Sequence, residues 1–369
     1  MTWVAIPTAS APTMLVPLRA RAGATALHQY NQSMSQVARL RKAGAGLAFR
    51  AGAGRLMGRG QLRVAGGRAS AAWDDLIGTV LPEVTGLPRC EVAISVGRAL
   101  RPNLKPVLQV VDRSGMSVAY VKIGWNQLTT ALVRNEARAL RALARSPSPI
   151  LQAPRLLGER VWNGLSLTIL SPLRHRLWRR GRINQPPATA VLAEVAELGG
   201  IEVGTLGDSA YLSGLESRIR SLPDTPRSSE LTLAARRLLD RMGGVEMAFG
   251  GAHGDWAPWN MGRSGDRWTV WDWERSSHPA PVGSDALHFA FEVAYHKERR
   301  RVGEAADMVL GRAAEQLDGL DVHPASRPAL LELFLIERLL RLEDGRSLGL
   351  AVDDHLADGL SRAVVGRSS

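Results

Sequence analysis

The residues best suited to chemistry lie in two short stretches in the second half of the chain. The first reads His253-Gly-Asp-Trp-Ala-Pro-Trp-Asn260, and the second reads Trp271-Asp-Trp-Glu274. Phosphoryl transfer requires a carboxylate that orients or deprotonates the attacking hydroxyl, and oxygen ligands that hold magnesium on the nucleotide phosphates. Asp255 and Asn260, five residues apart on one loop, can supply these two functions. Asp272, at the end of a neighbouring strand, would complete the metal site.

This pattern resembles the catalytic signature of the aminoglycoside phosphotransferase and choline kinase superfamily, which shares the protein-kinase-like fold. In protein kinases the matching loop is H-R-D-x-x-x-x-N, and the metal-binding Asp opens D-F-G. Here Trp273-Glu274 replaces the Phe-Gly, as is usual in the small-molecule branch. The resemblance implies that Asp255 is the catalytic base and that Asn260 and Asp272 are magnesium ligands. His253 would organise the loop. The alternative interpretation is a polar turn between helices, whose acids only cap them.

The region before these motifs offers an independent check. A kinase places a Lys on its third strand, where it contacts the α- and β-phosphates and pairs with a Glu of the next helix. Lys122 lies at the end of the third strand expected here, and Glu136 follows fourteen residues later in a helix expected over Leu128–Ala144. The expected strands are Val92–Gly97, Pro106–Asp112 and Ser117–Ile123, followed by Pro154–Leu157 and Leu165–Leu170.

The loop between the first two strands matches the phosphate-covering loop of kinases least well. It runs from Ser95 to Lys105 and contains one glycine, Gly97, in place of G-x-G-x-x-G. The backbone N–H groups of Ser95 and Gly97 are the candidate phosphate contacts, and Arg98, Arg101 or Lys105 would add charge. An ordinary basic hairpin loop is the alternative. No Walker A sequence G-x-x-x-x-G-K-[ST] occurs, so a P-loop kinase is not supported.

The order of expected elements predicts an α+β protein with a two-lobed, protein-kinase-like fold. Residues 1–85 form a basic N-terminal helical extension, residues 86–172 a nucleotide-binding lobe with a small antiparallel sheet, and residues 173–369 a mainly helical catalytic lobe. The nucleotide is expected between the lobes. The helices expected in the catalytic lobe are Ala188–Leu206, Ala210–Leu222, Ser229–Met242, Asp285–Val302 and Pro328–Leu342, with a strand at Trp268–Trp273.

Residues 25–65 are strongly basic, with apolar residues between the charges. We expect a solvated helical segment that packs on the main body, preceded by a loop over Thr8–Pro17. The alternative is a basic amphipathic surface in peripheral contact with an anionic membrane. Glycines such as Gly44, Gly46 and Gly52 weaken a continuous amphipathic helix and favour the first interpretation.

Composition narrows the possible partners. Hydrophobic residues make up 45% of the 369 residues and charged residues 22%, which permits a sizeable core and argues against global disorder. The net charge of +12 suggests anionic partners such as nucleotides, but no zinc-type spacing or RNA-binding signature occurs, so nucleic acid is not expected. Cys90 is the only cysteine, which excludes an intrachain disulfide and fits a cytoplasmic protein. Neither a secretory signal nor a membrane span is predicted.

Together these features predict an ATP- and magnesium-dependent phosphotransferase that acts on a hydroxyl of a small molecule. The acceptor stays open among aminoglycosides, sugars, amino alcohols and similar compounds, and so does the oligomeric state. The alternative is a non-catalytic kinase-fold binding or scaffold protein, with peripheral membrane attachment as one form of it. Of the remaining polar residues, Asp285 is expected to cap a helix or to have a structural role near the active site. Three histidines near these motifs are expected at the surface or in the packed interior, namely His278, His288 and His296.

Overall fold

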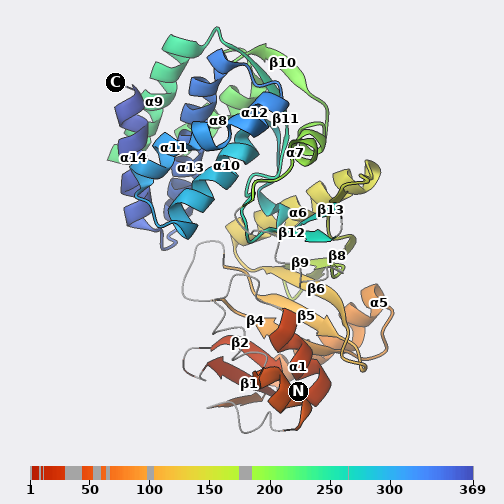
Figure 1. Cartoon of the computed structure of the whole chain (residues 1–369). Helices are drawn as coiled ribbons and strands as arrows, with labels where there is room; N and C mark the ends of the chain where they lie inside the picture. The colour runs from red at the N-terminus through yellow and green to blue at the C-terminus, as the bar shows by residue number, and fades with distance from the viewer. Residues whose placement is uncertain are drawn as a thin grey trace. The chain divides into compact units, whose positions relative to one another are not determined.

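The computed structural model describes residues 2–7, 10, 12–29, 44–52, 60–63, 67–97, 104–173, 185–264 and 266–368. Figure 1 shows the course of the chain. The chain divides into two compact units, the first comprising Met1–Leu140 and Pro154–Arg174 and the second Arg141–Ala153 and His175–Ser369. The three-part division proposed from the sequence stays a prediction. No helix among the described residues is both long enough and apolar enough to cross a lipid bilayer.

An eight-stranded antiparallel sheet is the main feature of the first unit. The strand order is β3-β1-β2-β4-β5-β6-β9-β8, and each neighbouring pair is antiparallel. All five strands predicted in this region form. The strands are β1 (Thr2–Pro7), β2 (Pro12–Pro17), β3 (Gln61–Arg63), β4 (Glu91–Ser95), β5 (Val107–Val111), β6 (Ser117–Gly124), β8 (Leu156–Trp162) and β9 (Leu165–Leu170).

The N-terminal segment contains strands that the sequence did not predict. The loop predicted over Thr8–Pro17 is wrong from Pro12 onward, where the chain forms β2. The apolar run Met14–Val16 of this strand is buried in the sheet. The two prolines of β2 lie at its ends, where a missing N–H donor disturbs the sheet least. Trp3 of β1 donates from Nε1 to the Val92 carbonyl at 2.7 Å. The first strands are therefore integral to the sheet rather than an appendage on it.

Helices of the same segment form as well, as expected from the sequence, and they are short. They are α1 (Ala20–Gln29), α4 (Gly67–Asp75) with its π-helical continuation η1 (Leu76–Val80), and α5 (Leu81–Thr85). Leu76 and Leu81 join the buried cluster formed by strand residues such as Val92, Leu108 and Val121. Most of the proposed membrane-contacting segment, residues 30–43, 53–59 and 64–65, lies outside the described residues.

Helix α6 (Gln127–Arg145) follows β6 directly, as predicted. Its first turn is stabilised by Asn126, whose Oδ1 accepts from the Thr129 backbone N–H at 2.7 Å, and by the Thr129 hydroxyl, which accepts from the Asn126 N–H at 3.0 Å. A Cβ on Gly124 would lie 2.6 Å from the Thr130 Cα, so only glycine allows this tight entry into the helix. The buried face of α6 includes Glu136.

The second unit is mainly helical and carries two three-stranded sheets (Figure 1). The long helix α13 packs against α8, α9, α10, α11 and α14. The sheets have the orders β10-β11-β14 and β12-β13-β7. The helices are α7 (Thr189–Ala196), α8 (Ala210–Arg220), α9 (Pro226–Met242), α10 (Ser284–Glu292), α11 (Val302–Arg312), α12 (Ala314–Gly319), α13 (Arg327–Ser347) and α14 (Asp354–Ser368). The strands are β7 (Leu151–Gln152), β10 (Glu202–Thr205), β11 (Glu246–Ala252), β12 (Met261–Ser264), β13 (Arg267–Val270) and β14 (Ser277–Pro281).

Two helix predictions in this unit need correction. The helix expected over Ala188–Leu206 ends at Ala196, because Gly199 and Gly200 adopt positive φ angles of 91° and 94°, and the chain continues as β10. The helix expected over Asp285–Val302 is α10, and it changes to the π-helical turn η3 (Val293–Lys297) before it ends. A π turn inside a helix occurs often at functional sites.

Candidate active site

The loop that carries Asp255 connects β11 to β12 and is anchored by buried neighbours. Trp256 is fully buried and directs its Nε1–H at the Met261 sulfur, 3.2 Å away. Gly254 has φ of 76°, and a Cβ there would lie 2.2 Å from the Arg275 carbonyl oxygen. The loop therefore passes so close to the segment after β13 that the Arg of the H-R-D pattern does not fit, and glycine takes its place.

His253 is fully buried beneath the loop. Its Nε2 lies 3.0 Å from the Trp271 carbonyl oxygen, and its Nδ1 accepts from the Asp255 backbone N–H at 3.2 Å. These contacts assign the proton to Nε2. Burial lowers the pKa of His253 in spite of the nearby carboxylates, so the ring is neutral. His253 thus ties the loop to the end of β13, the arrangement that a loop-organising residue requires.

Asp285 acts on the backbone of the same loop. Its carboxylate accepts from the N–H groups of His253 at 2.7 Å and Gly254 at 2.8 Å. Asp285 lies in the first turn of α10, where the helix dipole favours a negative charge. It makes no side-chain cap there, since the N-cap residue is Gly283. Of the two expected roles, the structure therefore supports the structural one near the active site.

Asp255 differs from its neighbours because it reaches the surface. Its side chain is 37% exposed, and both carboxylate oxygens have donors. Asn260 Nδ2 donates to Oδ2 at 2.9 Å, and His288 Nε2 lies 3.2 Å from Oδ1. Burial raises the pKa of Asp255, but the hydrogen bond and field of His288, with smaller effects from neighbours such as Arg275, lower it more. The group is therefore an ionised, oriented carboxylate that can accept a hydrogen bond from a hydroxyl.

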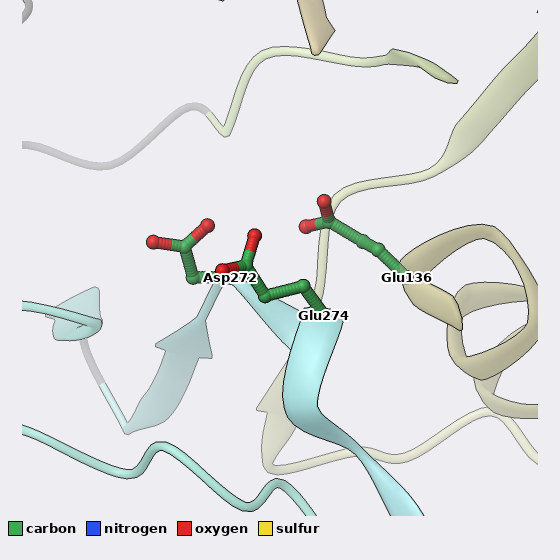
Figure 2. Close-up of side chains that lie close together, drawn as sticks. All are labelled: Glu136, Asp272 and Glu274. Atoms are coloured by element: carbon green, nitrogen blue, oxygen red, sulfur yellow. The ribbon is translucent and has the colours of Figure 1, made fainter. Parts of the chain in front are cut away.

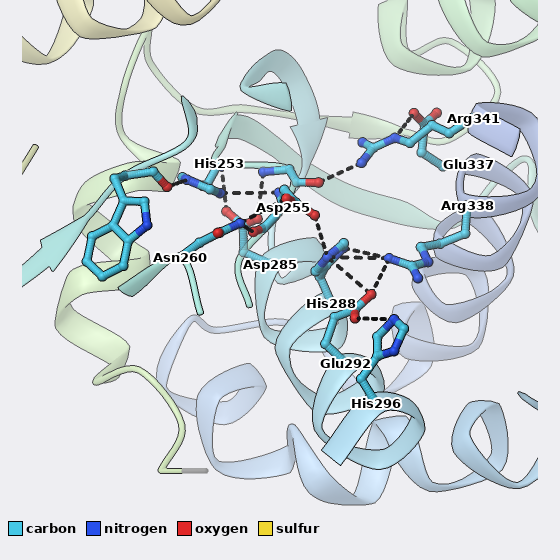
Figure 3. A network of polar contacts seen from close by, with 12 residues as sticks. His253, Asp255, Asn260, Asp285, His288, Glu292, His296, Glu337, Arg338 and Arg341 are labelled. Atoms are coloured by element: carbon cyan, nitrogen blue, oxygen red, sulfur yellow. Dashed lines mark hydrogen bonds and ion pairs between the residues drawn. The ribbon is translucent and has the colours of Figure 1, made fainter. Parts of the chain in front are cut away.

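His288 was not among the site residues predicted from the sequence, where it was expected to be a packed or surface histidine. It is buried, and it belongs to a polar row along α10 and η3 that Figure 3 shows next to Asp255. Glu292 and His296 continue the row, and Arg338 of α13 contacts Glu292 at 2.7 Å. The i, i+4, i+8 spacing of His288, Glu292 and His296 is the sequence signal that could have identified this row.

Asp272 and Glu274 lie where β13 runs into the short helix η2 (Trp273–Arg275). Asp272 has left-handed backbone angles, φ 71° and ψ 48°, which Asp tolerates better than most residues. Their carboxylate oxygens lie within 4.8 Å of each other (Figure 2). The amide of Asn260 donates to the Asp255 carbonyl and carboxylate, which leaves its oxygen as the atom suited to a cation. These oxygen donors fit a hard divalent cation such as magnesium, and Glu274 joins the predicted ligands as a candidate.

In the first unit, Lys122 of β6 and Glu136 of α6 form a direct ion pair. The Lys122 Nζ lies 2.8 Å from Oε1 and 2.6 Å from Oε2 of Glu136. The side chain of Glu136, also drawn in Figure 2, is fully buried, and that of Lys122 is 12% exposed. The Thr168 hydroxyl of β9 donates to the Val133 carbonyl at 2.9 Å and attaches α6 to the sheet. The strand and helix thus bring together the two residues that the sequence had paired.

The expected phosphate-covering loop is described only at its ends. Ser95 is the last residue of β4 and pairs with Val107 of β5. Gly97 has φ of 74°, and a Cβ there would lie 2.3 Å from the Leu104 Cδ1. Arg98 and Arg101 lie outside the described residues. A phosphate-binding role for Ser95 and Gly97 stays a prediction.

Comparison with solved structures identifies the fold. The choline kinase LicA from Streptococcus pneumoniae is similar with a TM-score of 0.51 and 13% sequence identity, over 80% of this chain and 99% of that one. A thermostable mutant of the aminoglycoside phosphotransferase APH(4)-Ia, in a ternary complex with ADP and hygromycin B, also gives 0.51, with 12% identity over 79% of this chain and 98% of that one. No protein-family model and no curated protein sequence matches the chain. The chain therefore has the kinase-like fold of the aminoglycoside phosphotransferases and choline kinases, as the sequence predicted.

Proposed function

We propose that the protein is an ATP- and magnesium-dependent phosphotransferase that transfers the γ-phosphoryl group to a hydroxyl of a small molecule. One observation carries this proposal: Asp255 is a partly exposed carboxylate whose two oxygens are held by Asn260 and His288, on a loop whose other residues are largely buried. A carboxylate that is ionised, oriented and accessible is what an acceptor hydroxyl needs from a catalytic base.

In the proposed reaction Asp255 accepts a hydrogen bond from the acceptor hydroxyl. As the bond from the hydroxyl oxygen to the γ-phosphorus forms, the bond from that phosphorus to the β–γ bridging oxygen breaks, and ADP leaves. The hydroxyl proton passes to Asp255 and then to solvent. The low pKa of Asp255 keeps the carboxylate ionised before each turnover, although it makes the group a weak base. Its main contribution is therefore orientation of the hydroxyl.

The nucleotide would be bound by charged groups of the chain. Lys122, fixed by Glu136, is suited to the α- and β-phosphates. Magnesium held by Asn260, Asp272 and Glu274 would neutralise phosphate charge. The similar structures support a nucleotide substrate, because they include complexes of LicA with AMP and of APH(4)-Ia with ADP or AMP-PNP. Which acceptor is used stays open among sugars, amino alcohols, aminoglycosides and related hydroxyl compounds.

The first test is ATP binding and turnover by the purified protein, with and without magnesium, against pooled sugars, amino alcohols, aminoglycosides and nucleosides. We expect one pool to be phosphorylated by the wild type and not by Asp255→Ala or Asp272→Ala. Asp266→Ala is the matched control, because Asp266 is a fully exposed acid on the β12–β13 turn. If neither ATP nor magnesium binds, the catalytic proposal fails and the non-catalytic binding protein takes its place.

A further inference from the structure

We propose that His288 is a positioning residue that fixes the carboxylate of Asp255 for the acceptor hydroxyl. This inference rests on the proposed function and deepens it. Asp255 has one donor from its own loop, Asn260, which moves with the loop. His288 provides the other donor from a different element, α10, with its Nε2 3.2 Å from Oδ1. The contact from His288 is the one that links the carboxylate directly to an element outside the loop.

His288 is itself held rigidly. It is 3% exposed, and its ring lies edge-on to Phe334, with 6.1 Å between the ring centroids. Arg338 Nη1 lies 3.4 Å from both ring nitrogens, and Glu292 Oε1 lies 3.7 Å from Nε2. Arg338 is in turn held by Glu292 at 2.7 Å and stacks over the Phe291 ring at 4.8 Å. A histidine confined in this way has one orientation to offer Asp255.

The same row contacts the catalytic loop at a second point. His296 lies 3.3 Å from Glu292 and meets the Trp259 ring edge-on, with 5.5 Å between the centroids. The Lys297 ammonium lies 5.7 Å from the centre of the same Trp259 ring. Trp259 immediately precedes Asn260 in the loop. The segment from His288 to Lys297 therefore contacts the loop at Asp255 and at Trp259, on either side of the buried residues 256–258.

The π turn explains how one helix face can make both contacts. Four residues of α-helix advance about 400°, so an i, i+4, i+8 row drifts by about 80° around a regular helix. Residues 293–297 form the π-helical turn η3, whose wider winding advances less per residue and reverses part of that drift. His288, before the turn, and His296, inside it, can then both face the loop, with Glu292 between them.

An apolar row would fill this space at lower cost. Burying charged and polar groups is unfavourable unless they are paired, and replacing such clusters by apolar residues is often neutral or stabilising. A leucine at position 288, however, would leave Oδ1 of Asp255 without its donor. Stability therefore does not explain why polar residues occupy this row. Their contacts with Asp255 and Trp259 of the loop do.

The test compares three substitutions of the same residue. The amide nitrogen of Gln takes the place of the histidine Nε2, whereas that of Asn takes the place of Nδ1. We expect kcat to fall about 10- to 100-fold in His288→Leu and His288→Asn, with the KM for ATP unchanged, and to recover to within about threefold of the wild type in His288→Gln. A residue that only filled space would be replaced by Leu as well as by Gln, because both are close to histidine in size. His355→Leu, an exposed histidine on α14, is the control for loss of a histidine.

A second measurement does not depend on an acceptor. In histidine-selective nitrogen NMR, the Nε2 resonance of His288 should shift in Asp255→Asn and stay in place in Asp266→Asn. The positioning role alone is overturned if the wild type turns over and the Gln and Asn variants have equal kcat. It is likewise overturned if the Nε2 resonance of His288 does not shift in Asp255→Asn. A wild type that binds no magnesium ATP overturns the proposed function, and the positioning role with it. The NMR result stands even if His288→Leu does not fold.

Discussion

The two units hold their functional charges in different ways. In the first unit, Lys122 and Glu136 neutralise each other, and both are mostly or fully removed from solvent. In the second unit, Asp255 keeps its charge at the surface, 37% exposed, and is oriented by Asn260 and His288. A buried ion pair couples stability to function, because removing one partner leaves the other charge buried. In an exposed carboxylate held by hydrogen-bond donors, stability and function are coupled less strongly. Substituting Asp255 should therefore affect turnover far more than folding.

The largest expected effect is on turnover in the second unit. Asp255→Asn should lower kcat by about 10³-fold, within the range of general acid–base catalysis. The free energy of unfolding should fall less than in a variant that breaks the buried ion pair, because the favourable contact of Asp255 with His288 is partly exposed to solvent. The asparagine keeps the shape of the side chain but cannot take the hydroxyl proton. Kinetics and urea denaturation of the same preparation measure both quantities. If Asp255→Asn lost as much unfolding free energy as a variant of the buried ion pair, the contrast between the two units would not hold.

The ion pair of the first unit should behave in the opposite manner. Lys122→Met should lower the free energy of unfolding by about 3–5 kcal/mol, because Glu136 is left buried without its cation, and it should also reduce ATP affinity. Adding Glu136→Leu should recover stability but not ATP binding. Denaturation and ATP titration of the single and double variants test this. If the double variant stayed as unstable as the single one, the pair would have no such structural role.

A pH experiment measures how much Glu337, a carboxylate of the second unit outside the proposed catalytic loop, contributes to stability. Burial raises the pKa of Glu337, but Arg341 and Arg218 lower it more, to below the ordinary value of 4.5. A lowered folded-state pKa stabilises the protein above the unfolded-state pKa, and this stabilisation is lost as the pH falls through the folded-state value. The stability gap between wild type and Glu337→Gln should therefore be widest at neutral pH and shrink on acidification. Urea denaturation from pH 7 to pH 3 measures it, and a gap that widened in acid would contradict it.

The smallest expected effect concerns Cys90, a buried group of the first unit outside the proposed site. Burial, with a smaller effect from Glu91, raises the pKa of the thiol from 9.0 to about 11. At pH 8 the reactive thiolate should be about 100-fold scarcer than in the unfolded chain, so labelling by a disulfide reagent should be slow until urea is added. Cys90→Ser should leave ATP turnover unchanged. Rapid labelling of the native protein would show that this part of the sheet opens readily.

Local features that the sequence predicted are those whose signal lies in neighbouring residues. The alternation in β6 and the periodicity of α6 placed Lys122 and Glu136 on adjacent elements, and both elements form nearly as expected. The proposed catalytic loop was identified from a short motif of polar residues and tryptophans. The strand β2 was missed because its prolines indicate a loop, whereas the burial of Met14, Leu15 and Val16 between them decides the outcome. Propensity is a weak guide where a short segment is buried in a sheet.

By itself the sequence determined the kinase-like α+β fold, the pairing of Lys122 with Glu136, and the identity of the loop that carries Asp255. Only the tertiary structure decided what holds that loop. The donor His288 is 33 residues beyond Asp255, and Arg338, which contacts it, is 50 residues further along on another helix. No local pattern encodes such contacts, because they depend on how helices pack and on where a π turn changes their register. That is why a histidine of ordinary appearance in the sequence lies beside the proposed catalytic carboxylate in the structure.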